Sequence, residues 1–420
     1  MTVAGTVRVP GDKSISHRAL ILGALATGAG RVRGILDSAD VRATAGVLRA
    51  LGANVPAVAP DMTVRGRGTR SLRASDRPLD CANSGTSARL MAGVLAAHPF
   101  SSTLVGDASL SRRPMQRVAQ PLAAMGASFE LAPGGTLPMT VHGAELSSVE
   151  YTSETASAQV KSAVLLAALV AGVEVTFREP VRSRDHTERM LAARGVEVWV
   201  NEQAVMLWPT AGLPPADVEV PGDPSSAAFF VALAAMSGNG SVDLPDVCLN
   251  ETRIGFLAAM ARMGANLDVQ DERQSGGEPV GRLVVRGGAL RGVRVGDAEV
   301  PSLIDELPLL ACVAAHAEGE TEIRGAAELR VKESDRIATV VANLRAVGAD
   351  ADELPDGMVV RGADRPLRGR VRAHADHRIA MAFAILGARP GNAIEVDDPA
   401  CVDVSYPSFW RDLARVTGAP

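Results

Sequence analysis

Aromatic residues are scarce in this chain, at 3% of 420 residues. The core must therefore be aliphatic, built from Ala, Val, Leu and Met, and a nucleic acid would find few rings on which to stack. The formal net charge of −5 also disfavours a general nucleic-acid binder, because the phosphate backbone selects basic surfaces. An anionic ligand must instead be held by local clusters of Lys and Arg.

The chain also lacks the signs of disulfides, of export and of a membrane span. Its four cysteines, which form no Cys-x-x-Cys pair and which we interpret as reduced, buried thiols of a cytoplasmic protein, are Cys81, Cys248, Cys312 and Cys401. The N-terminus carries the charged residues Arg8, Asp12 and Lys13 and has no apolar h-region, so we expect no signal peptide. The longest apolar run, Ala163–Val173, is too short to cross a bilayer, and we expect no membrane partner.

Motifs for cofactors are missing too. The sequence contains neither a Walker A motif nor a dinucleotide-binding GxGxxG motif, and no Ser or Cys nucleophile constellation stands out. His374 and His377 could pair on a metal ion, but two histidines alone are poor evidence for one. We therefore expect no metal and no cofactor.

The most informative stretch that is present is Gly11–Arg18, which is polar and precedes the apolar run Ala19–Ala26. This profile predicts a loop that enters a buried helix, capped by Asp12, Ser14 or Ser16. A helix N-terminus favours anions, and Lys13 and Arg18 add two positive charges. The stretch predicts a phosphate or carboxylate site; taken alone, it is equally compatible with a capped surface helix whose charges are solvated.

The same layout recurs six times. A patch of polar and small residues leads into an Ala/Leu/Val helix, with copies that begin at residues 11, 80, 153, 221, 301 and 375. A second, more one-sided helix follows in the copies and ends at glycine, which is typical of the C′ position; these glycines are Gly52, Gly126, Gly195, Gly264 and Gly348. The repeat predicts an α/β protein with six units of about 70 residues, three per half. The halves should meet near residues 212–222.

Charged residues gather at the starts of several copies. They include arginines that suit carboxylate or phosphate and acids at helix starts that suit proton transfer. The segments are Arg112–Arg113, Ser157–Lys161, Ser183–Arg189, Asp305–Glu306, Leu329–Arg336 and Asp376–Arg378. Each could also be a solvated or salt-bridged surface face. Together they indicate a transferase or lyase that acts on phosphorylated acids.

In order along nearly the whole chain, these stretches resemble the motifs of the 5-enolpyruvylshikimate-3-phosphate (EPSP) synthase family. The resemblance rests on Gly11–Arg18, Asn83–Thr86, Arg113–Pro114, Lys332–Arg336 and Asp376–Arg378. Ser157–Lys161, Arg184–Glu188 and Asn250–Arg253 resemble the class II branch of that family. The resemblance implies a two-domain inverse α/β barrel (the enolpyruvyl transferase fold) with six βαβαββ repeats. The implied domains are 13–220 and 221–420, with the first strand, 1–12, added to the second.

The resemblance also implies a reaction. The 5-hydroxyl of 3-phosphoshikimate adds to C2 of phosphoenolpyruvate while C3 is protonated, and the tetrahedral adduct then loses phosphate. Residues implied to hold 3-phosphoshikimate are Lys13, Ser14, Arg18, Ser157, Ala158, Gln159, Arg184, Asp305 and Lys332. Residues implied to hold phosphoenolpyruvate are Lys13, Gly85, Arg113, Gln159, Arg336 and Arg378. Asp305 would take the hydroxyl proton, with Glu333 and Lys13 as the other candidates for proton transfer.

Two positions distinguish this chain within the family it resembles. Many members carry a lysine near the C-terminus that reaches phosphoenolpyruvate, whereas this chain has Val404 in that stretch. Gly85 is the small residue expected in members that are sensitive to the inhibitor glyphosate. The partners that the resemblance implies are the two small-molecule substrates and the inhibitor glyphosate. The low aromatic content and ordinary charge content of the chain favour a monomer.

Three alternatives were weighed against this interpretation. The related enolpyruvyl transferase for UDP-N-acetylglucosamine uses a cysteine in a loop that corresponds to Gly106–Arg113, where this chain has none. An inactive phosphate-binding scaffold would be expected to have lost residues such as Lys13, Asp305, Glu333 and Arg336, and all four are present. An RNA-end-processing relative is disfavoured by the net acidity and the few aromatics.

Overall fold

The structure, a computed structural model, describes residues 3–418. Contacts divide the chain into two compact units. The N-terminal unit comprises Gly11–Val220 and Gln274–Glu278, and the C-terminal unit comprises Met1–Pro10, Pro221–Arg273 and Pro279–Pro420. The domain bounds given above stay a prediction; within them, residues 1–2 and 419–420 lie outside the described residues.

The N-terminal unit contains three copies of the repeat. The first copy consists of α1 (Lys13–Leu25), β2 (Thr27–Arg33), α2 (Ala39–Ala50), β3 (Asp61–Arg67) and β12 (Val218–Glu219). The second consists of β4 (Leu79–Asp80), α3 (Gly85–Ala96), β5 (Ser101–Val105), the 3-10 turn η1 (Leu110–Arg112), α4 (Gln116–Ala124), β6 (Ser128–Ala132) and β7 (Thr136–His142). The third consists of β8 (Val149–Thr152), α5 (Ala158–Ala171), β9 (Val175–Arg178), α6 (His186–Ala192), β10 (Val198–Val200) and β11 (Ala204–Leu207).

The C-terminal unit contains the other three copies. The fourth consists of β1 (Ala4–Thr6), α7 (Pro224–Met236), β13 (Ser241–Cys248), α8 (Gly255–Arg262), β14 (Asn266–Ser275) and β15 (Glu278–Arg286). The fifth consists of β16 (Arg294–Val295), α9 (Val300–Leu303), α10 (Leu307–Ala314), β17 (Gly319–Ile323), η2 (Ala327–Val331), α11 (Arg336–Ala346), β18 (Asp350–Leu354) and β19 (Gly357–Gly362). The sixth consists of β20 (Arg368–Val371), α12 (His377–Gly387), β21 (Ala393–Val396), η3 (Pro399–Val404) and α13 (Phe409–Thr417).

The sheets share one pairing pattern. In the second copy the strand order is β4-β5-β7-β6, with the first pair parallel and the next two antiparallel; the third and fifth copies repeat this order. The chain's first strand, β1, pairs in parallel with β13 of the fourth copy. The two-residue strand β12 takes the equivalent place beside β2 in the first copy. The sixth copy differs, because its sheet has only β20 and β21 and the chain then continues into η3 and α13.

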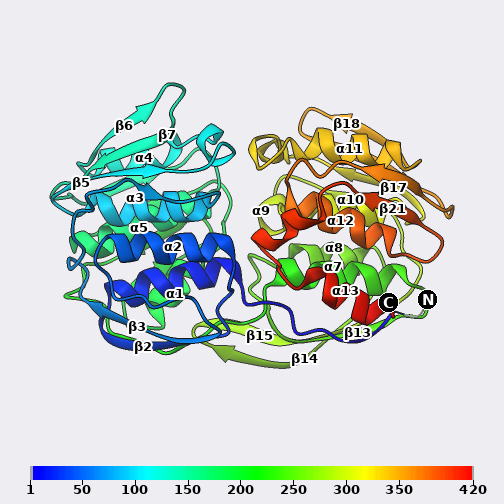
Figure 1. Cartoon of the computed structure of the whole chain (residues 1–420), viewed down its shortest axis with the longest axis horizontal. Helices are drawn as coiled ribbons and strands as arrows, with labels where there is room; N and C mark the ends of the chain where they lie inside the picture. The colour runs from blue at the N-terminus through cyan, green and yellow to red at the C-terminus, as the bar shows by residue number, and fades with distance from the viewer. Residues whose placement is uncertain (1–2, 419–420) are drawn as a thin grey trace. The chain divides into compact units, whose positions relative to one another are not determined.

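The first helix of each copy is buried on all sides, as its apolar sequence predicts. Every residue of α7 is buried, and so is the run Val160–Val170 of α5. Figure 1 shows the helices of each unit packed against one another, with the strands toward the outside of that unit. The cores are largely aliphatic, as predicted. The scarce rings of the C-terminal unit nevertheless cluster: Phe230, Tyr406 and Phe409 lie with centroids 5.7–6.3 Å apart.

Glycines end the second helices and also let the strands approach the first helices. Gly52 and Gly348 have φ of +82° and +93°, the left-handed conformation that a C′ glycine adopts, which confirms the prediction. Gly143 directly follows β7, and a β-carbon there would lie 1.8 Å from the carbonyl oxygen of His98, just past α3. Likewise, a β-carbon on Gly362 would lie 1.8 Å from the carbonyl oxygen of Ala317, just past α10. These glycines therefore allow a close approach of strand and helix that any side chain would block.

We predict that Gly143→Ala lowers the free energy of unfolding by at least about 1–3 kcal/mol, because backbone must move to admit the methyl group. The matched control is Gly46→Ala in the middle of α2, where a β-carbon would meet nothing within 4 Å. That change should stabilise the protein by about 0.5–1 kcal/mol. Urea unfolding of both variants tests the prediction, and equal midpoints would contradict it.

Candidate functional site

Side chains cap the helices at whose N-termini the predicted ligand residues lie. Asp12 accepts a hydrogen bond from the Ile15 N–H at 2.8 Å and so caps α1. Ser84 caps α3 through the Ser87 N–H at 3.1 Å. The cap predicted among Asp12, Ser14 and Ser16 is therefore Asp12. The capped first turns carry Lys13, Ser14 and Gly85, with backbone N–H groups and partial positive charge in the same place.

Arg18 lies in the interior of the N-terminal unit, 3% exposed. Its Nε donates to Thr187 Oγ1 and its Nη2 to Ser162 Oγ, each at 2.7 Å, and its Nη1 donates to the Ser14 carbonyl at 3.0 Å. Burial lowers the pKa of Arg18 to about 10, and the charge of Arg184 adds to this lowering. Arg18 thus remains a cation near neutral pH, and it links α1 to α5 and α6.

Lys13 forms an ion pair with Asp40 of α2, and its side chain is 23% exposed. Our sequence analysis did not find Asp40. The only signal was its place at the start of a second helix, where acids are common for reasons unrelated to ligands.

A second cluster surrounds Gly85 in the same unit. A β-carbon on Gly85 would lie 2.8 Å from Arg89 Nη1 and 3.5 Å from Arg113 Nη1. Arg113 donates to Asn83 Oδ1 at 2.7 Å. Gln159 accepts from Arg89 Nη1 at 2.7 Å. The structure therefore brings Gly85, Arg113 and Gln159 together, as the resemblance implied. It adds Arg89, which the sequence analysis missed although it follows Gly85 by one helical turn.

The proline after Arg113 does not begin a helix. Proline suits the N1 position of a helix, but α4 begins only at Gln116, and the residues before Arg113 form the 3-10 turn η1. The reason is local. The Arg113 N–H donates to the Leu110 carbonyl at 3.0 Å, and the Met115 N–H donates to the Gly135 carbonyl at 2.8 Å.

The remaining predicted residues of this unit lie at α5 and in the segment before α6. Ser157 is the N-cap residue of α5, with the Val160 N–H 3.5 Å from its Oγ, and Ala158 begins the helix. Arg184 lies between Ser183 and Asp185, which are both buried. Its charge acts on Arg18, so these two predicted 3-phosphoshikimate ligands lie close enough to each other to interact electrostatically.

In the C-terminal unit the predicted residues gather around Arg336, whose side chain is 1% exposed. Its Nε donates to Asp376 at 2.8 Å and its Nη2 to Glu333 at 2.7 Å, while its Nη1 lies 3.6 Å from Asp305. Burial alone would lower the pKa of Arg336, but these carboxylates, Asp376 first, outweigh it and raise the pKa. Asp376 also caps α12 by accepting from the Arg378 N–H. The sequence analysis had placed Asp376 in a motif without giving it a role.

Asp305 precedes α10 and lies between two guanidinium groups. Arg378 Nη2 is 3.5 Å from its carboxylate, and Arg378 Nη1 also contacts Glu306 at 3.2 Å. Asp305 is 15% exposed. Burial lowers the pKa of Lys332, on which Asp305 acts as the first of the opposing charges. The structure thus places the carboxylate of Asp305, the residue that the resemblance implies to be the proton acceptor, beside two guanidinium groups.

A buried hydrogen-bonded chain connects the starts of α1 and α3. It runs from His17 Nδ1 to Thr44 Oγ1 at 2.7 Å, then to Ser87 Oγ at 2.6 Å and to the cap residue Ser84 at 2.8 Å. His17 is fully buried, and among residues 3–418 its Nε2 has no hydrogen-bond partner. Burial therefore lowers the pKa of His17 to about 3, and the ring is neutral at working pH.

We predict that His17 makes the protein sensitive to acid. The unfolded chain binds a proton near pH 6.5, whereas the folded chain does not bind it until about pH 3. The free energy of unfolding should therefore decrease as the pH is lowered across this window, by up to about 1.4 kcal/mol per pH unit. His17→Asn should flatten the pH dependence of urea unfolding, whereas Thr44→Val should lower stability without changing the slope. An unchanged slope in His17→Asn would contradict the prediction.

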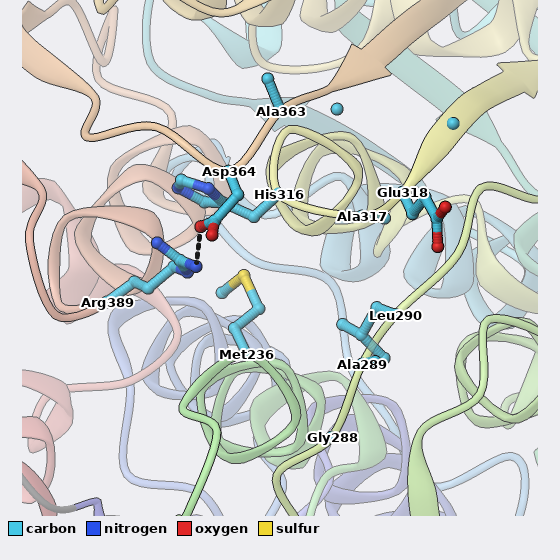
Figure 2. A pocket seen from close by; sticks show the side chains of 12 residues that line it. Met236, Gly288, Ala289, Leu290, His316, Ala317, Glu318, Ala363, Asp364 and Arg389 are labelled. Carbon is cyan, nitrogen blue, oxygen red and sulfur yellow. Dashed lines mark hydrogen bonds and ion pairs between the residues drawn. The ribbon is translucent and has the colours of Figure 1, made fainter.

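A pocket of about 390 Å³ in the C-terminal unit lies apart from these clusters. Figure 2 shows its lining, with Arg389 bonded to Asp364 beside His316. Arg389 and His316 follow the ends of α12 and α10, whereas Arg378 and Asp305 lie at the starts of the same helices. Helices of 8 and 11 residues separate the two places by roughly 12–16 Å. None of the predicted site residues lines this pocket.

Val404 is the last residue of η3 and is half-buried, so no cation occupies the position at which many members of the family carry a lysine. The four cysteines are free thiols, as predicted. The prediction that they are buried is confirmed for Cys81, Cys248 and Cys312 and is wrong for Cys401, which is partly exposed. Burial raises the pKa of Cys81 to about 12, which leaves its thiol protonated and inert.

Among residues 3–418, no group of three or more His, Cys, Asp or Glu side chains is arranged to hold a metal ion. Within the same residues, no helix has the length and apolar character needed to cross a membrane.

Comparison with known proteins agrees with the geometry. Residues 1–413 match the family model described as EPSP synthase (3-phosphoshikimate 1-carboxyvinyltransferase). A 3-phosphoshikimate 1-carboxyvinyltransferase of Alkalilimnicola ehrlichii is 49% identical over 407 residues, which cover 96% of this chain and 91% of the relative. The enzyme of that name from a Sulfurihydrogenibium species is 45% identical, over 99% of this chain and 97% of the relative.

Solved structures are similar as well. The structure of EPSP synthase from Acinetobacter baumannii superposes with a TM-score of 0.87 at 40% identity, covering 99% of this chain and 95% of that one. The enolpyruvyl transferase NikO from Streptomyces tendae, at 18% identity and a TM-score of 0.77 over 99% of this chain and 95% of that one, shares the fold. The predicted fold, a two-domain inverse α/β barrel, is confirmed. The chain belongs to the EPSP synthase (3-phosphoshikimate 1-carboxyvinyltransferase) family.

Proposed function

We propose that this chain transfers the enolpyruvyl group of phosphoenolpyruvate to the 5-hydroxyl of 3-phosphoshikimate and releases phosphate, by addition and elimination. This is the step of the shikimate pathway that leads to chorismate and the aromatic amino acids. The observation that carries the proposal is the cluster around Arg336: a buried guanidinium with Asp305, Glu333 and Asp376 about it, in a chain similar over its length to enzymes named for this reaction. No cofactor enters the reaction.

The residues carry the following proposed roles. Asp305 accepts the proton of the 5-hydroxyl as that oxygen attacks C2 of phosphoenolpyruvate, and Glu333 and Lys13 are the other groups that move protons. Lys13, Ser14, Arg18, Ser157, Ala158, Gln159, Arg184, Asp305 and Lys332 bind 3-phosphoshikimate. Lys13, Gly85, Arg113, Gln159, Arg336 and Arg378 bind phosphoenolpyruvate. The cations stabilise the negative charge that develops as phosphate departs.

Arg89 supports a refinement of this assignment. It donates to both Gln159 and the Pro114 carbonyl, at 2.7 and 3.1 Å, and lies closest to the β-carbon position of Gly85. Arg89 thus adds a second cation beside Arg113 in the proposed phosphoenolpyruvate site. We propose that it supplies the positive charge that a lysine near position 404 supplies in many members of the family.

Several finer assignments belong to the same proposal. The class II motifs, Ser157–Lys161, Arg184–Glu188 and Asn250–Arg253, support membership of the class II branch. The free thiols support a cytoplasmic location, where thiols stay reduced. We propose that the protein acts as a monomer and that UDP-N-acetylglucosamine is not an acceptor, since Gly106–Arg113 lacks a cysteine.

Phosphate release from phosphoenolpyruvate, measured with and without 3-phosphoshikimate, tests the function. We expect release only when 3-phosphoshikimate is present. Phosphate release with UDP-N-acetylglucosamine in place of 3-phosphoshikimate would show that UDP-N-acetylglucosamine is the acceptor. No release with either acceptor, from protein that still binds 3-phosphoshikimate in calorimetry, would indicate an inactive phosphate-binding scaffold.

We further predict that glyphosate inhibits this protein in competition with phosphoenolpyruvate, and that Gly85→Ala relieves the inhibition. A methyl group at residue 85 would lie 2.8 Å from the flexible end of Arg89, so the protein can accommodate it while the anion site is narrowed. We expect the inhibition constant to rise by at least about tenfold, a change of about 1.4 kcal/mol. Inhibition kinetics of both proteins check this, and equal inhibition constants would contradict it.

A further inference from the structure

Lys161 is a buried ammonium group in the first turn of α5, an otherwise apolar helix. Its side chain is 1% exposed, and its Nζ lies 2.7 Å from Glu179 Oε1 and 2.9 Å from Glu188 Oε1. Burial alone would lower the pKa of Lys161, but Glu188 and Glu179 outweigh it, so the pKa is raised and the group is charged. An apolar side chain would fill this place at less cost. The charge therefore calls for a reason other than stability.

The contacts of Lys161 suggest that reason, because they fix the backbone next to Arg184. Lys161 Nζ donates to the Ser183 carbonyl at 3.2 Å, and the Ser183 N–H donates to Glu179 Oε1 at 2.9 Å. Both polar backbone groups of Ser183 are thus held by the same buried pair. Ser183 directly precedes Arg184, so the ion pair sets the direction in which the chain presents the Arg184 side chain.

The residue after Arg184 is anchored separately. Asp185 is 2% exposed, and it accepts from Arg182 Nη2 at 2.6 Å and from Arg189 Nε at 2.9 Å. Arg184 is half-buried and lies between these two fixed residues, so its backbone is held in place before a ligand arrives. Preorganisation of this kind lowers the entropic cost of binding an anion.

The hydrogen bonds that hold the Arg18 side chain go to Thr187, Ser162 and Ser14, and none of them goes to Lys161 or Glu179. Thr187, which accepts from Arg18 Nε, donates to Ser162 Oγ at 2.8 Å, and Ser162 also accepts from Arg18 Nη2. Adjacent residues of α5 thus hold two different arginines: Ser162 contacts Arg18 directly, and Lys161 reaches Arg184 through Ser183. Loss of the Lys161 charge should release the second arginine and leave the first in place.

We propose that Lys161 is a positioning residue for 3-phosphoshikimate, acting through Ser183 to hold Arg184 in the orientation that binds this anionic substrate. The proposal rests on the function proposed above. It assigns Lys161 no contact with either substrate and no part in proton transfer. It makes the buried pair with Glu179 a determinant of substrate affinity.

The test compares the Michaelis constants of the two substrates in charge-matched variants. Lys161→Met alone leaves two glutamates facing each other and can fail to fold. The double variant Lys161→Met/Glu179→Gln removes one charge of each sign. We expect the KM for 3-phosphoshikimate to rise at least tenfold in the double variant, while the KM for phosphoenolpyruvate stays within twofold. A rise in both constants together, or in neither, would overturn the proposal.

A double-mutant cycle with Arg184 tests the route. If Lys161 acts through Arg184, adding the Lys161→Met/Glu179→Gln change to Arg184→Met should raise the KM for 3-phosphoshikimate by less than twofold. If the two changes instead multiply their separate effects on this KM, Lys161 acts independently of Arg184, and the proposed action through Arg184 is rejected. Asp412→Ala, which removes a buried carboxylate bonded to Ser408 in the C-terminal unit, is the control for general destabilisation and should change neither KM.

Calorimetric binding of 3-phosphoshikimate separates this proposal from the proposed function. Wild-type protein that binds no 3-phosphoshikimate and releases no phosphate with it would reject the proposed function. Wild-type protein that binds it, together with a double variant that binds it equally well, would reject the role of Lys161 alone.

Discussion

Asp305→Ala is expected to lower the rate of phosphate release by at least about a hundredfold, since a positioned general base contributes about 10²–10⁴ to a rate. The carboxylate lies 3.6 Å from Arg336 and 3.5 Å from Arg378. Steady-state rates at saturating concentrations of both substrates measure the effect.

Two controls separate lost base chemistry from lost packing. Asp305→Asn keeps the size of the side chain but cannot accept the proton, so it should be nearly as slow as Asp305→Ala. Glu299→Ala removes an acid that pairs with Arg262 at the surface of the same unit and should keep the wild-type rate. A rate within threefold of wild type in Asp305→Asn would transfer the role of base to Glu333.

Arg336→Met is expected to cost about 3–5 kcal/mol of stability, because it removes the cation from a buried cluster of carboxylates. Asp376 is fully buried and would lose the guanidinium group that donates to it. The same change should raise the KM for phosphoenolpyruvate more than that for 3-phosphoshikimate. Arg336→Lys keeps the charge but not the forked geometry, so it should recover part of the stability and little of the affinity.

The pH dependence of unfolding gives this prediction a second readout. Burial alone would raise the pKa of Asp376, but the charge and hydrogen bonds of Arg336 outweigh it, so the pKa lies below its ordinary value of 3.8. The resulting stability is present above pH 3.8 and is lost as the pH falls through the lowered value. In Arg336→Met the pKa of Asp376 should rise, and the acid loss should begin at higher pH. Identical acid profiles would contradict this account.

Features that are local in sequence could be predicted without the structure. Six buried helices follow from six apolar runs, and the cap at Asp12 and the left-handed C′ glycines follow from single residues beside them. The proposed ligand residues were named from the resemblance to a known family, which could be recognised because several of its motif residues are contiguous in Gly11–Arg18 and Lys332–Arg336.

Features that depend on distant partners could not be predicted. Lys161 meets Glu179 and Glu188, which are separated from it by a helix and a strand, and no spacing rule connects them. Strand β12 has two residues, too few to show a period. Nothing in the sequence around Arg89 distinguishes it from other polar residues of a buried helix. Its role is indicated only by its hydrogen bond to Gln159, which is distant in the sequence.

The pairing of β1 with β13 has a consequence for how the chain is synthesised. When residues 3–10 leave the ribosome, more than 200 further residues must be synthesised before their partner strand, 241–248, is available. At 5–20 residues per second this is a delay of about 10–50 s. The sheet of β12, β2 and β3 is complete once residue 219 has emerged. A nascent chain halted after residue 220 therefore carries a strand with no partner, and a polypeptide 221–420 made separately should accept residues 3–10 as a peptide in trans.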